Sequence, residues 1–484
     1  MPDACVRVAV RPDLYADSVT LLHVTSAVKE LSGVQEVAIV VGTPVNRELL
    51  ERLDLLQDEV PSGPNDLVMA VRADDAASAE AALRQAEALL ARGVSAPLSG
   101  GEVAARSLRS ARQRLPEAKL AVISVPGPYA AAEAHQALSD GLHVFLFSDN
   151  VPMDEEVRLK ERARQQGLLL MGPDCGTAIL GGVGLGFANM VRRGRVGLVG
   201  ASGTGLQELS VLLHQAGEGI SQAIGTGSRD LRAEVGGVTT LQALLLLADD
   251  PETERIVLVS KPPDPEVASA VLEAAATTGK PVVACLLGVP VAAPPGVVVV
   301  DTLEEAAGWT PSRQGGMPHW SVRPQPWLGH ASPPVGSRAP VLGLYCGGTL
   351  AEEARLVLGG GTFVDLGDDR YTQGRAHPII DPTLRTRAIR EAGADPSVEV
   401  LLLDVILGFA AHPDPASVIA PAVREAIQRA AEDGRHLSVL AHIVGTDGDP
   451  QGLDQQVATL RAAGVELQPS NAALARRLPS ISSR

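Results

Sequence analysis

The chain has 484 residues, a formal net charge of −16 and 45% hydrophobic residues. At roughly 100–200 residues per domain this length corresponds to three or four domains, and the apolar content excludes general disorder. The acidic balance excludes a nucleic-acid-binding protein, which needs a basic surface. Aromatic residues make up only 2%, which also excludes aromatic platforms for stacking bases or sugars.

The N-terminal stretch alternates short β-rich runs with helical ones. Strands are predicted at 7–11, 34–41 and 66–71, and helices at 18–31, 47–58 and 74–92. This order predicts a small α/β domain over 1–95, with the helices on one face of the sheet.

A polar, Arg-rich connector with some helix is predicted over 93–118. Beyond it, strands at 119–125, 143–148 and 168–171 alternate with helices at 129–142 and 155–166. Uninterrupted apolar strands between helices of this length indicate a parallel sheet. We therefore expect an α/β domain with a parallel sheet over 96–190.

Two further α/β units, at 191–310 and 341–484, are separated by a predicted linker at 311–340 that contains seven prolines. Both units begin with a strand, a Gly-rich turn and a helix, in VGLVGASGTG and VLGLYCGGTL. Two pairs of landmarks recur at an offset of 145 residues: Gly203-Thr204 with Gly348-Thr349, and Asp250-Pro251 with Asp395-Pro396. Such self-similarity indicates duplicated flavodoxin-like units.

The two Gly-rich turns are candidate phosphate-binding loops. They consist of Ser202, Gly203, Thr204 and Gly205 in the first unit, and of Gly347, Gly348 and Thr349 in the second. At a strand-to-helix turn, the free amides and the helix dipole favour an anion. Each loop alone is equally consistent with a tight turn and a helix cap. If the two units face each other, both helix dipoles converge on one phosphate.

Other candidates have structural alternatives. Arg229 and Arg370 lie in loops after the second strand of each unit, where they would bind a substrate carboxylate or form ordinary loop charges. His377 and Asp381 lie four residues apart and are either an acid/base pair or a hydrogen-bonded loop. Cys175 and Cys346 are candidate nucleophiles or small buried residues.

No metal site, disulfide or membrane segment is expected. The four cysteines are far apart and show no Cys-x-x-Cys spacing. The N-terminus is charged where a signal peptide is apolar, and no apolar run reaches the about 18 residues that span a bilayer. The expectation is a cytoplasmic protein that contacts neither membrane nor nucleic acid.

The region from 119 to 180, which contains the turn Gly172-Pro173-Asp174-Cys175, resembles the later part of the CoA-binding domain of the succinyl-CoA synthetase alpha subunit. This resemblance implies a truncated, Rossmann-like domain of the CoA-binding type over 96–190. The unit that starts with VGLVGASGTG is similar to the ligase domain of that subunit, and the YCGGTLAEEA unit resembles the ligase domain of its beta partner. With the strings GRAHPIIDP and GFAAHPDPA, nearly the whole chain resembles the FdrA family.

This resemblance implies two helix N-termini, near Gly203-Thr204 and Gly348-Thr349, that grip a phosphoryl group. The synthetases carry that group on a histidine in a Gly-His-Ala-Gly-Ala loop. No histidine occurs here between His214 and His319. An ATP-grasp domain and the Gly-rich CoA loop have no counterpart either, so the resemblance leaves CoA binding open.

The leading hypothesis, implied by the FdrA resemblance, is one subunit of a multi-protein, oligomeric transferase that uses carbamoyl phosphate or another acyl phosphate, as in oxamate carbamoyl transfer in purine catabolism. Ser202 to Gly205 and Gly347 to Thr349 would bind phosphate. His377 would polarise the carbonyl, and Arg229 or Arg370 would bind a carboxylate of the anionic substrate. One alternative is an acid–thiol ligase component that uses CoA with a separate ATP-grasp partner. The other is a non-catalytic, metabolite-binding scaffold.

Overall fold

The computed structural model describes residues 107–308, 340–372 and 376–478 without gaps. It also describes residue 105 and, in the N-terminal part, residues 5–94 with gaps at 13, 15–17, 44–45, 48–49, 52, 57–62 and 64–65. The chain divides into two units, Met1–Arg106 with Gln373–Ala376, and Ser107–Thr372 with His377–Arg484. Except for Pro340, the predicted linker at 311–340 lies outside the described residues.

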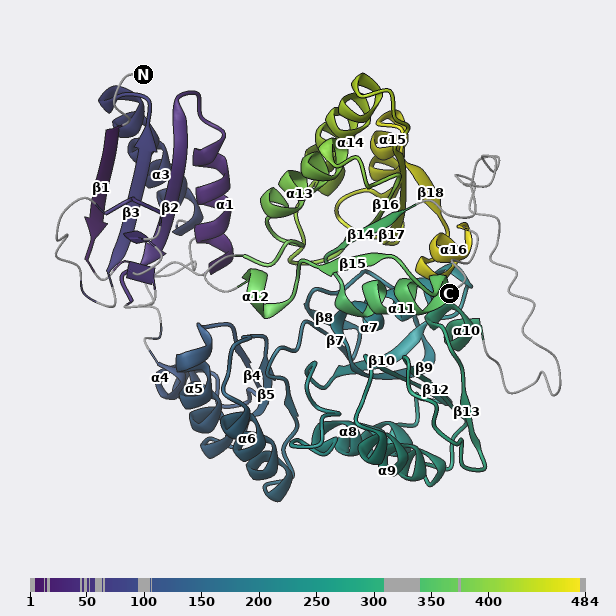
Figure 1. Cartoon of the computed structure of the whole chain (residues 1–484). Coiled ribbons are helices and arrows are strands. Elements are labelled where there is room, and N and C mark those ends of the chain that lie inside the picture. The colour runs from purple at the N-terminus through teal and green to yellow at the C-terminus, as the bar shows by residue number, and fades with distance from the viewer. Residues whose placement is uncertain are drawn as a thin grey trace. The chain divides into compact units, whose positions relative to one another are not determined.

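The N-terminal unit is a three-stranded antiparallel sheet covered by two helices (Figure 1). Its elements are β1 (Cys5–Arg11), α1 (Ser18–Lys29), β2 (Val34–Val41), β3 (Leu67–Ala73) and α3 (Ala76–Val94). The apolar run of β3 occupies the centre, and Ala79, Ala82 and Ala86 of α3 share one buried cluster with Val28 of α1. The strands and these two helices confirm the predicted small α/β domain, whereas much of the predicted helix at 47–58 falls outside the described residues.

A Rossmann-like sheet of three parallel strands opens the second unit, in the order β4-β5-β6. Its elements are α4 (Leu108–Arg114), β4 (Leu120–Ile123), α5 (Gly127–Ser139), β5 (His143–Leu146), α6 (Met153–Gln165) and β6 (Leu170–Met171). The predicted parallel sheet is confirmed. The connector contains α4, which Ser107 and Ser110 start with a capping box.

Buried charges join this sheet to the rest of the second unit. Lys160 of α6 is fully buried, and its Nζ lies 2.6 Å from Asp230 and 3.0 Å from Glu156. Asp230 in turn accepts the amide of Thr240 (2.8 Å) in the first turn of helix α8 (Val238–Asp249). Because a buried cation is stable only when it is paired, these contacts fix the two parts together.

The first half, at 177–308, is built on a seven-stranded sheet in the order β13-β12-β11-β9-β10-β7-β8. Its elements are β7 (Thr177–Leu180), β8 (Val183–Gly186), β9 (Arg193–Ala201), α7 (Gly203–Gln215), β10 (Ile220–Gly225), α8 (Val238–Asp249), β11 (Arg255–Ser260), α9 (Pro265–Ala276), β12 (Val282–Leu286), β13 (Val297–Val299) and α10 (Leu303–Gly308). Strands β7 and β8 form a hairpin that was not predicted from the sequence, and β7 pairs antiparallel with β10.

The second half, at 341–478, has a five-stranded sheet in the order β15-β14-β16-β17-β18. Its elements are β14 (Val341–Tyr345), α11 (Gly348–Leu358), β15 (Thr362–Asp365), α12 (Asp369–Thr372), α13 (Thr383–Ala394), β16 (Val400–Ile406), α14 (Pro415–Glu432), β17 (Ser438–Val444), α15 (Leu453–Ala462), β18 (Glu466–Gln468) and α16 (Asn471–Arg476).

The two halves have the same parallel topology. Strands β9 to β13 of the first half and β14 to β18 of the second are each arranged in the order 2-1-3-4-5, which is the flavodoxin-like order. The duplication predicted from the 145-residue offset is therefore confirmed. Helices α7 and α11 pack against each other between the two sheets, within one apolar cluster that includes Leu209 and Ala354 (Figure 1).

Candidate functional site

The two Gly-Thr loops lie against each other. Ser202 Oγ is 2.5 Å from Thr349 Oγ1, and both side chains are buried. A Cβ added to Gly347 would lie 2.7 Å from Thr204 Oγ1, so this glycine is needed for the close approach of the first loop. The two halves therefore face each other at these loops, which is the condition under which both helix starts can approach one anion.

Each loop presents the start of a helix. Ser202 caps α7 by accepting the amide of Gly205 at 2.9 Å, and α11 begins at Gly348 without a side-chain cap. Gly203, Thr204 and Gly348 are only half-buried. In the described part of the chain, the amides of Gly203 and Gly348 donate to no acceptor. Such amides at helix starts are suited to an anion.

A buried carboxylate holds the second loop in place. Asp404 on β16 accepts the amides of Cys346 (2.9 Å) and Gly347 (2.8 Å). The guanidinium of Arg385 on α13 lies 2.9 Å from the same carboxylate, so the charge of Asp404 is paired. Burial nevertheless raises the pKa of Asp404. The first loop has no equivalent, since the matching position at the 145-residue offset is Val259.

Lys261, which follows β11, lies at the start of α11. Its Nζ is 3.6 Å from Asp365 Oδ2 at the end of β15. A Cβ added to Gly348 would collide with both Lys261 Nζ and Asp365 Oδ2. The ammonium group therefore adds its charge to the positive end of the helix dipole, with Asp365 as its counter-ion. Sequence reasoning missed this residue.

Lys261 also influences a group of ionisable side chains. Burial raises the pKa of Asp174 to about 6, while Ser228 and Lys261 oppose that rise. Burial, followed by the charge of Lys261, lowers the pKa of His377 to about 4. The pKa of Asp365 is raised by burial and lowered by Lys261. At neutral pH the imidazole is uncharged, so Lys261 supplies the positive charge among these groups.

The two predicted arginines have other partners. Arg229 donates to the carbonyl of Val151 (2.7 Å) and pairs with the buried Glu156 (2.8 Å). Arg370 lies largely exposed, 3.5 Å from Asp368. Binding of a substrate carboxylate by either arginine stays a prediction.

His377 and Asp381 make contact through the main chain, as the amide of Asp381 donates to the carbonyl of His377 (3.0 Å). The Asp381 carboxylate accepts the amide and hydroxyl of Thr383, and His377 Nδ1 accepts the amide of Ile379 (3.2 Å). His377 Nε2 faces Gly367 beside the second loop. The described contacts bring His377 to the site but do not pair it with the Asp381 side chain.

The cysteines in the site region are buried. Burial raises the pKa of Cys175 to about 12 and also raises that of Cys346, so both are thiols at neutral pH. In the described residues no group of three or more His, Cys, Asp or Glu side chains is arranged to bind a metal.

The candidate site therefore lies at the strand ends of both halves and consists of two helix starts, one lysine and a neutral imidazole. Free amides at helix starts and an ammonium group are chemically suited to a phosphoryl anion, because such donors favour negative charge.

Comparison with known proteins identifies a relative that covers nearly the whole chain. YahF of Escherichia coli is 39% identical over 508 aligned residues, which cover 96% of this chain and 96% of YahF. The chain belongs to the YahF family. YahF is itself described as uncharacterized, so its relationship assigns no activity to this member of the family.

Three family models match parts of this YahF-family chain. The AllF heavy metal-associated domain matches residues 4–105, the CoA binding domain residues 191–288, and the CoA-ligase model residues 344–479. The first match covers the N-terminal unit. The other two fall on the first and second halves, which carry the two Gly-Thr loops.

Ligase subunits match a smaller portion. The alpha 2 subunit of succinate–CoA ligase from Archaeoglobus fulgidus is 31% identical over 37% of this chain and 62% of its own length. The malate–CoA ligase alpha subunit of Methylorubrum extorquens is 28% identical over 35% and 59%. The chain thus spans about six tenths of the length of these subunits. An acetyl-coenzyme A synthetase from Ca. Korarchaeum cryptofilum, solved with phosphate and ADP, aligns at 16% identity over 75% of this chain and 82% of its own, with a TM-score of 0.33.

These relatives change the weight of the functional hypotheses. They support kinship with acyl-CoA synthetases and CoA ligases, and therefore the acid–thiol ligase alternative better than the leading one. They give carbamoyl transfer and a role in purine catabolism no support. In the described residues, no helix is long and apolar enough to cross a membrane.

Proposed function

We propose that this chain is the acyl-phosphate-handling component of an acid–thiol ligase, with CoA as the thiol substrate. The observation that carries the proposal is the 2.5 Å contact between Ser202 and Thr349, which brings two helix starts to one place. Kinship with succinate–CoA and malate–CoA ligase subunits supports this class of reaction.

In the proposed reaction, the thiol sulfur attacks the acyl carbon of an acyl phosphate. A C–S bond forms, and the bond from the acyl carbon to the phosphate oxygen breaks. Phosphate leaves with the electron pair, and the thiol proton passes to solvent or to the departing phosphate. The amides of Gly203 and Gly348 and the ammonium group of Lys261 stabilise the phosphate, because preorganised donors favour the charge that develops on a leaving group.

The carboxylate Asp365 has a defined place in this scheme. It lies beside the start of α11, next to Lys261, where a phosphate would approach. A bound phosphate would compete with Asp365 for the lysine, so binding requires the ion pair to open.

Because the loop after β12 contains no histidine, the proposed donor is a diffusible acyl phosphate. Carbamoyl phosphate belongs to this chemical class and stands as the second candidate donor. A separate partner chain would supply the nucleotide-binding part, and assembly into a larger oligomer is part of the proposal.

Calorimetric titration of the full chain with inorganic phosphate tests the anion site, and Gly203→Val with Gly348→Val is the variant. We expect saturable binding to the natural chain and its loss in the variant. Incubation with CoA and either acetyl phosphate or carbamoyl phosphate then tests the reaction, with thioester formation as the readout. Equal phosphate binding by the natural and variant chains would refute the proposed site.

A further inference from the structure

A pair of buried glutamates marks the interface between α7 and α11. Glu208 on α7 and Glu353 on α11 are 145 residues apart, so they occupy the same position in the two halves. Each follows the first glycine of its helix by five residues, and each is 1% exposed. Carboxylates are rarely buried unless their contacts are specific.

Glu208 is paired with a histidine of the second half. Its Oε2 lies 2.7 Å from His442 Nε2, and His442 Nδ1 lies 3.1 Å from the carbonyl oxygen of Gln468 on β18. A carbonyl oxygen and a carboxylate both only accept, so both ring nitrogens donate and the imidazole carries a charge. Burial lowers the pKa of His442, but Glu208 and Gln468 outweigh it and the pKa is raised.

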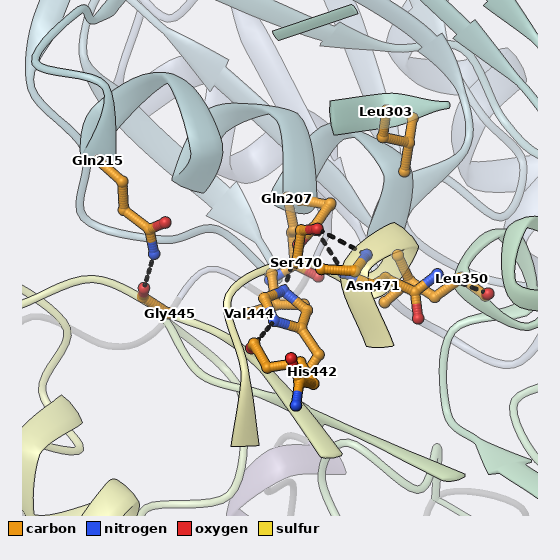
Figure 2. Close-up of polar contacts among 12 residues, drawn as sticks. Gln207, Gln215, Leu303, Leu350, His442, Val444, Gly445, Ser470 and Asn471 are labelled. Carbon is orange, nitrogen blue, oxygen red and sulfur yellow. Dashed lines mark hydrogen bonds and ion pairs between the residues drawn. The ribbon is translucent and has the colours of Figure 1, made fainter. Parts of the chain in front are cut away.

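Asn471, at the start of α16, bridges the two carboxylates. Its main-chain amide donates to Glu208 Oε1 (3.3 Å). Its side-chain Nδ2 donates to Glu353 Oε2 (2.7 Å) and to the carbonyl of Leu350 (2.8 Å). Glu353 Oε1 accepts the amide of Leu303 on α10 (2.7 Å). Figure 2 shows Asn471, Leu350 and His442 gathered beside Gln207 of α7.

The hydrogen bonds of the two glutamates depend on direction, whereas the apolar contacts around them do not. The apolar contacts between α7 and α11 depend on the area that is buried and do not by themselves fix a direction. The hydrogen bonds to the two buried carboxylates oppose a slide of one helix along the other, because each slide leaves a buried polar group unpaired. At about 1.5 Å of rise per residue, the glutamates lie about 7 Å along the helices from the loops, too far to touch a bound phosphate.

We propose that Glu208 and Glu353 are positioning residues that, through Asn471 and His442, hold α7 and α11 at the offset that brings the two Gly-Thr loops together. The effect of this positioning on phosphate binding rests on the proposed function, because a shared phosphate site needs both helix starts at a fixed separation.

The test uses the full chain and the variants Glu208→Gln and Glu353→Gln, with Glu352→Gln as the matched control. Glu352 lies next to Glu353 on α11, is partly exposed and pairs with Arg355. Three quantities are measured: the Kd for inorganic phosphate by calorimetry, the phosphorus NMR shift of the bound phosphate, and amide hydrogen exchange at 203–206 and 348–351. Thermal unfolding identifies the temperature range in which each variant is folded, and His442→Gln replaces a variant that does not fold.

Each glutamine variant is expected to raise the Kd for phosphate about tenfold, corresponding to one lost buried hydrogen bond. It should also change the phosphorus shift and accelerate exchange at both helix starts, while Glu352→Gln changes none of these. A purely structural role would lower the unfolding temperature and leave the Kd and the shift of the folded variant unchanged, which would overturn the inference.

The two proposals fail in different ways. If the natural chain binds no phosphate, the proposed function fails, and exchange alone decides whether the glutamates position the loops. Exchange at 203–206 and 348–351 that is identical in Glu353→Gln and in the natural chain would overturn the positioning role, whatever the phosphate result.

Discussion

The hydroxyl groups of Ser202 and Thr349 lie 2.5 Å apart, and the contact between Thr204 and Gly347 repeats that relationship. At the 145-residue offset Ser202 corresponds to Gly347 and Thr204 to Thr349. The two contacts are therefore made by equivalent pairs of positions, as contacts across a twofold axis are. The candidate site lies on a pseudo-twofold axis of a single chain.

The two glycines at the helix starts should respond differently to alanine. In Gly348→Ala the new methyl group collides with Lys261 and Asp365, whereas in Gly203→Ala it meets its nearest neighbours at 3.4–3.7 Å, an ordinary contact distance. We expect Gly348→Ala to weaken phosphate binding at least about tenfold. Calorimetry of both variants checks this, with Gly203→Ala as the matched control for stability. Equal effects would mean that the Lys261–Asp365 pair does not lie at the anion site.

Removal of the Lys261 charge should weaken anion binding and raise the pKa of His377. In Lys261→Met we expect phosphate affinity to fall about tenfold or more, because a charge-assisted contact is lost. We also expect the pKa of His377 to rise from about 4, since Lys261 contributes to its lowering. Calorimetry and an NMR titration of the imidazole measure the two effects. The exposed Lys119→Met serves as the charge-matched control and should leave both unchanged.

His377 makes the chain less stable in acid. Burial lowers the pKa of His377 to about 4, from the ordinary histidine value of about 6.5. Between those values His377 binds a proton in the unfolded chain but not in the folded chain. The contribution of His377 to stability therefore falls as the pH decreases from 6.5 to 4, and His377 adds no pH dependence above that window.

In His377→Gln this loss, about 1–3 kcal/mol, should disappear. Urea unfolding at a series of pH values checks it, and the exposed His436→Gln should keep the slope of the natural chain. An unchanged slope in His377→Gln would show that another group titrates in this window.

Asp404 should be among the most sensitive positions in the second half. Asp404→Asn leaves the buried Arg385 without its charged partner and weakens the bonds to the amides of Cys346 and Gly347. Loss of one member of a buried pair costs about 3–5 kcal/mol. Denaturant unfolding measures it. Asp433→Asn, in a partly exposed pair with Arg435, should cost no more than about 1 kcal/mol.

The repeat explains why the fold and the two loops were predictable from the sequence. A strand, a Gly-rich turn and a helix are specified by adjacent residues, and the 145-residue offset then relates one half to the other. The unpredicted β7–β8 hairpin also has a local signal in the sequence, because Gly181-Gly182 lies between two short apolar runs.

The rest of the site depends on contacts between distant residues. Lys261 meets Asp365 across 104 positions, and nothing next to either residue indicates the partner. Glu208 and Glu353 lie in helices where a glutamate ordinarily faces solvent, so only packing reveals their burial. The four-residue spacing of His377 and Asp381 was uninformative, because a turn separates the two side chains.

Both halves of the pseudo-twofold site belong to one chain, whereas the succinate–CoA ligase relatives match as alpha subunits over only part of it. Formation of the loop pair is therefore a folding event, and dilution of the protein cannot separate Gly203 from Gly348. Because one polypeptide contains both loops, they are always present in equal amounts. A substitution that damages one loop also disables the site of its own chain, because the damaged half cannot be replaced by an intact half from another molecule.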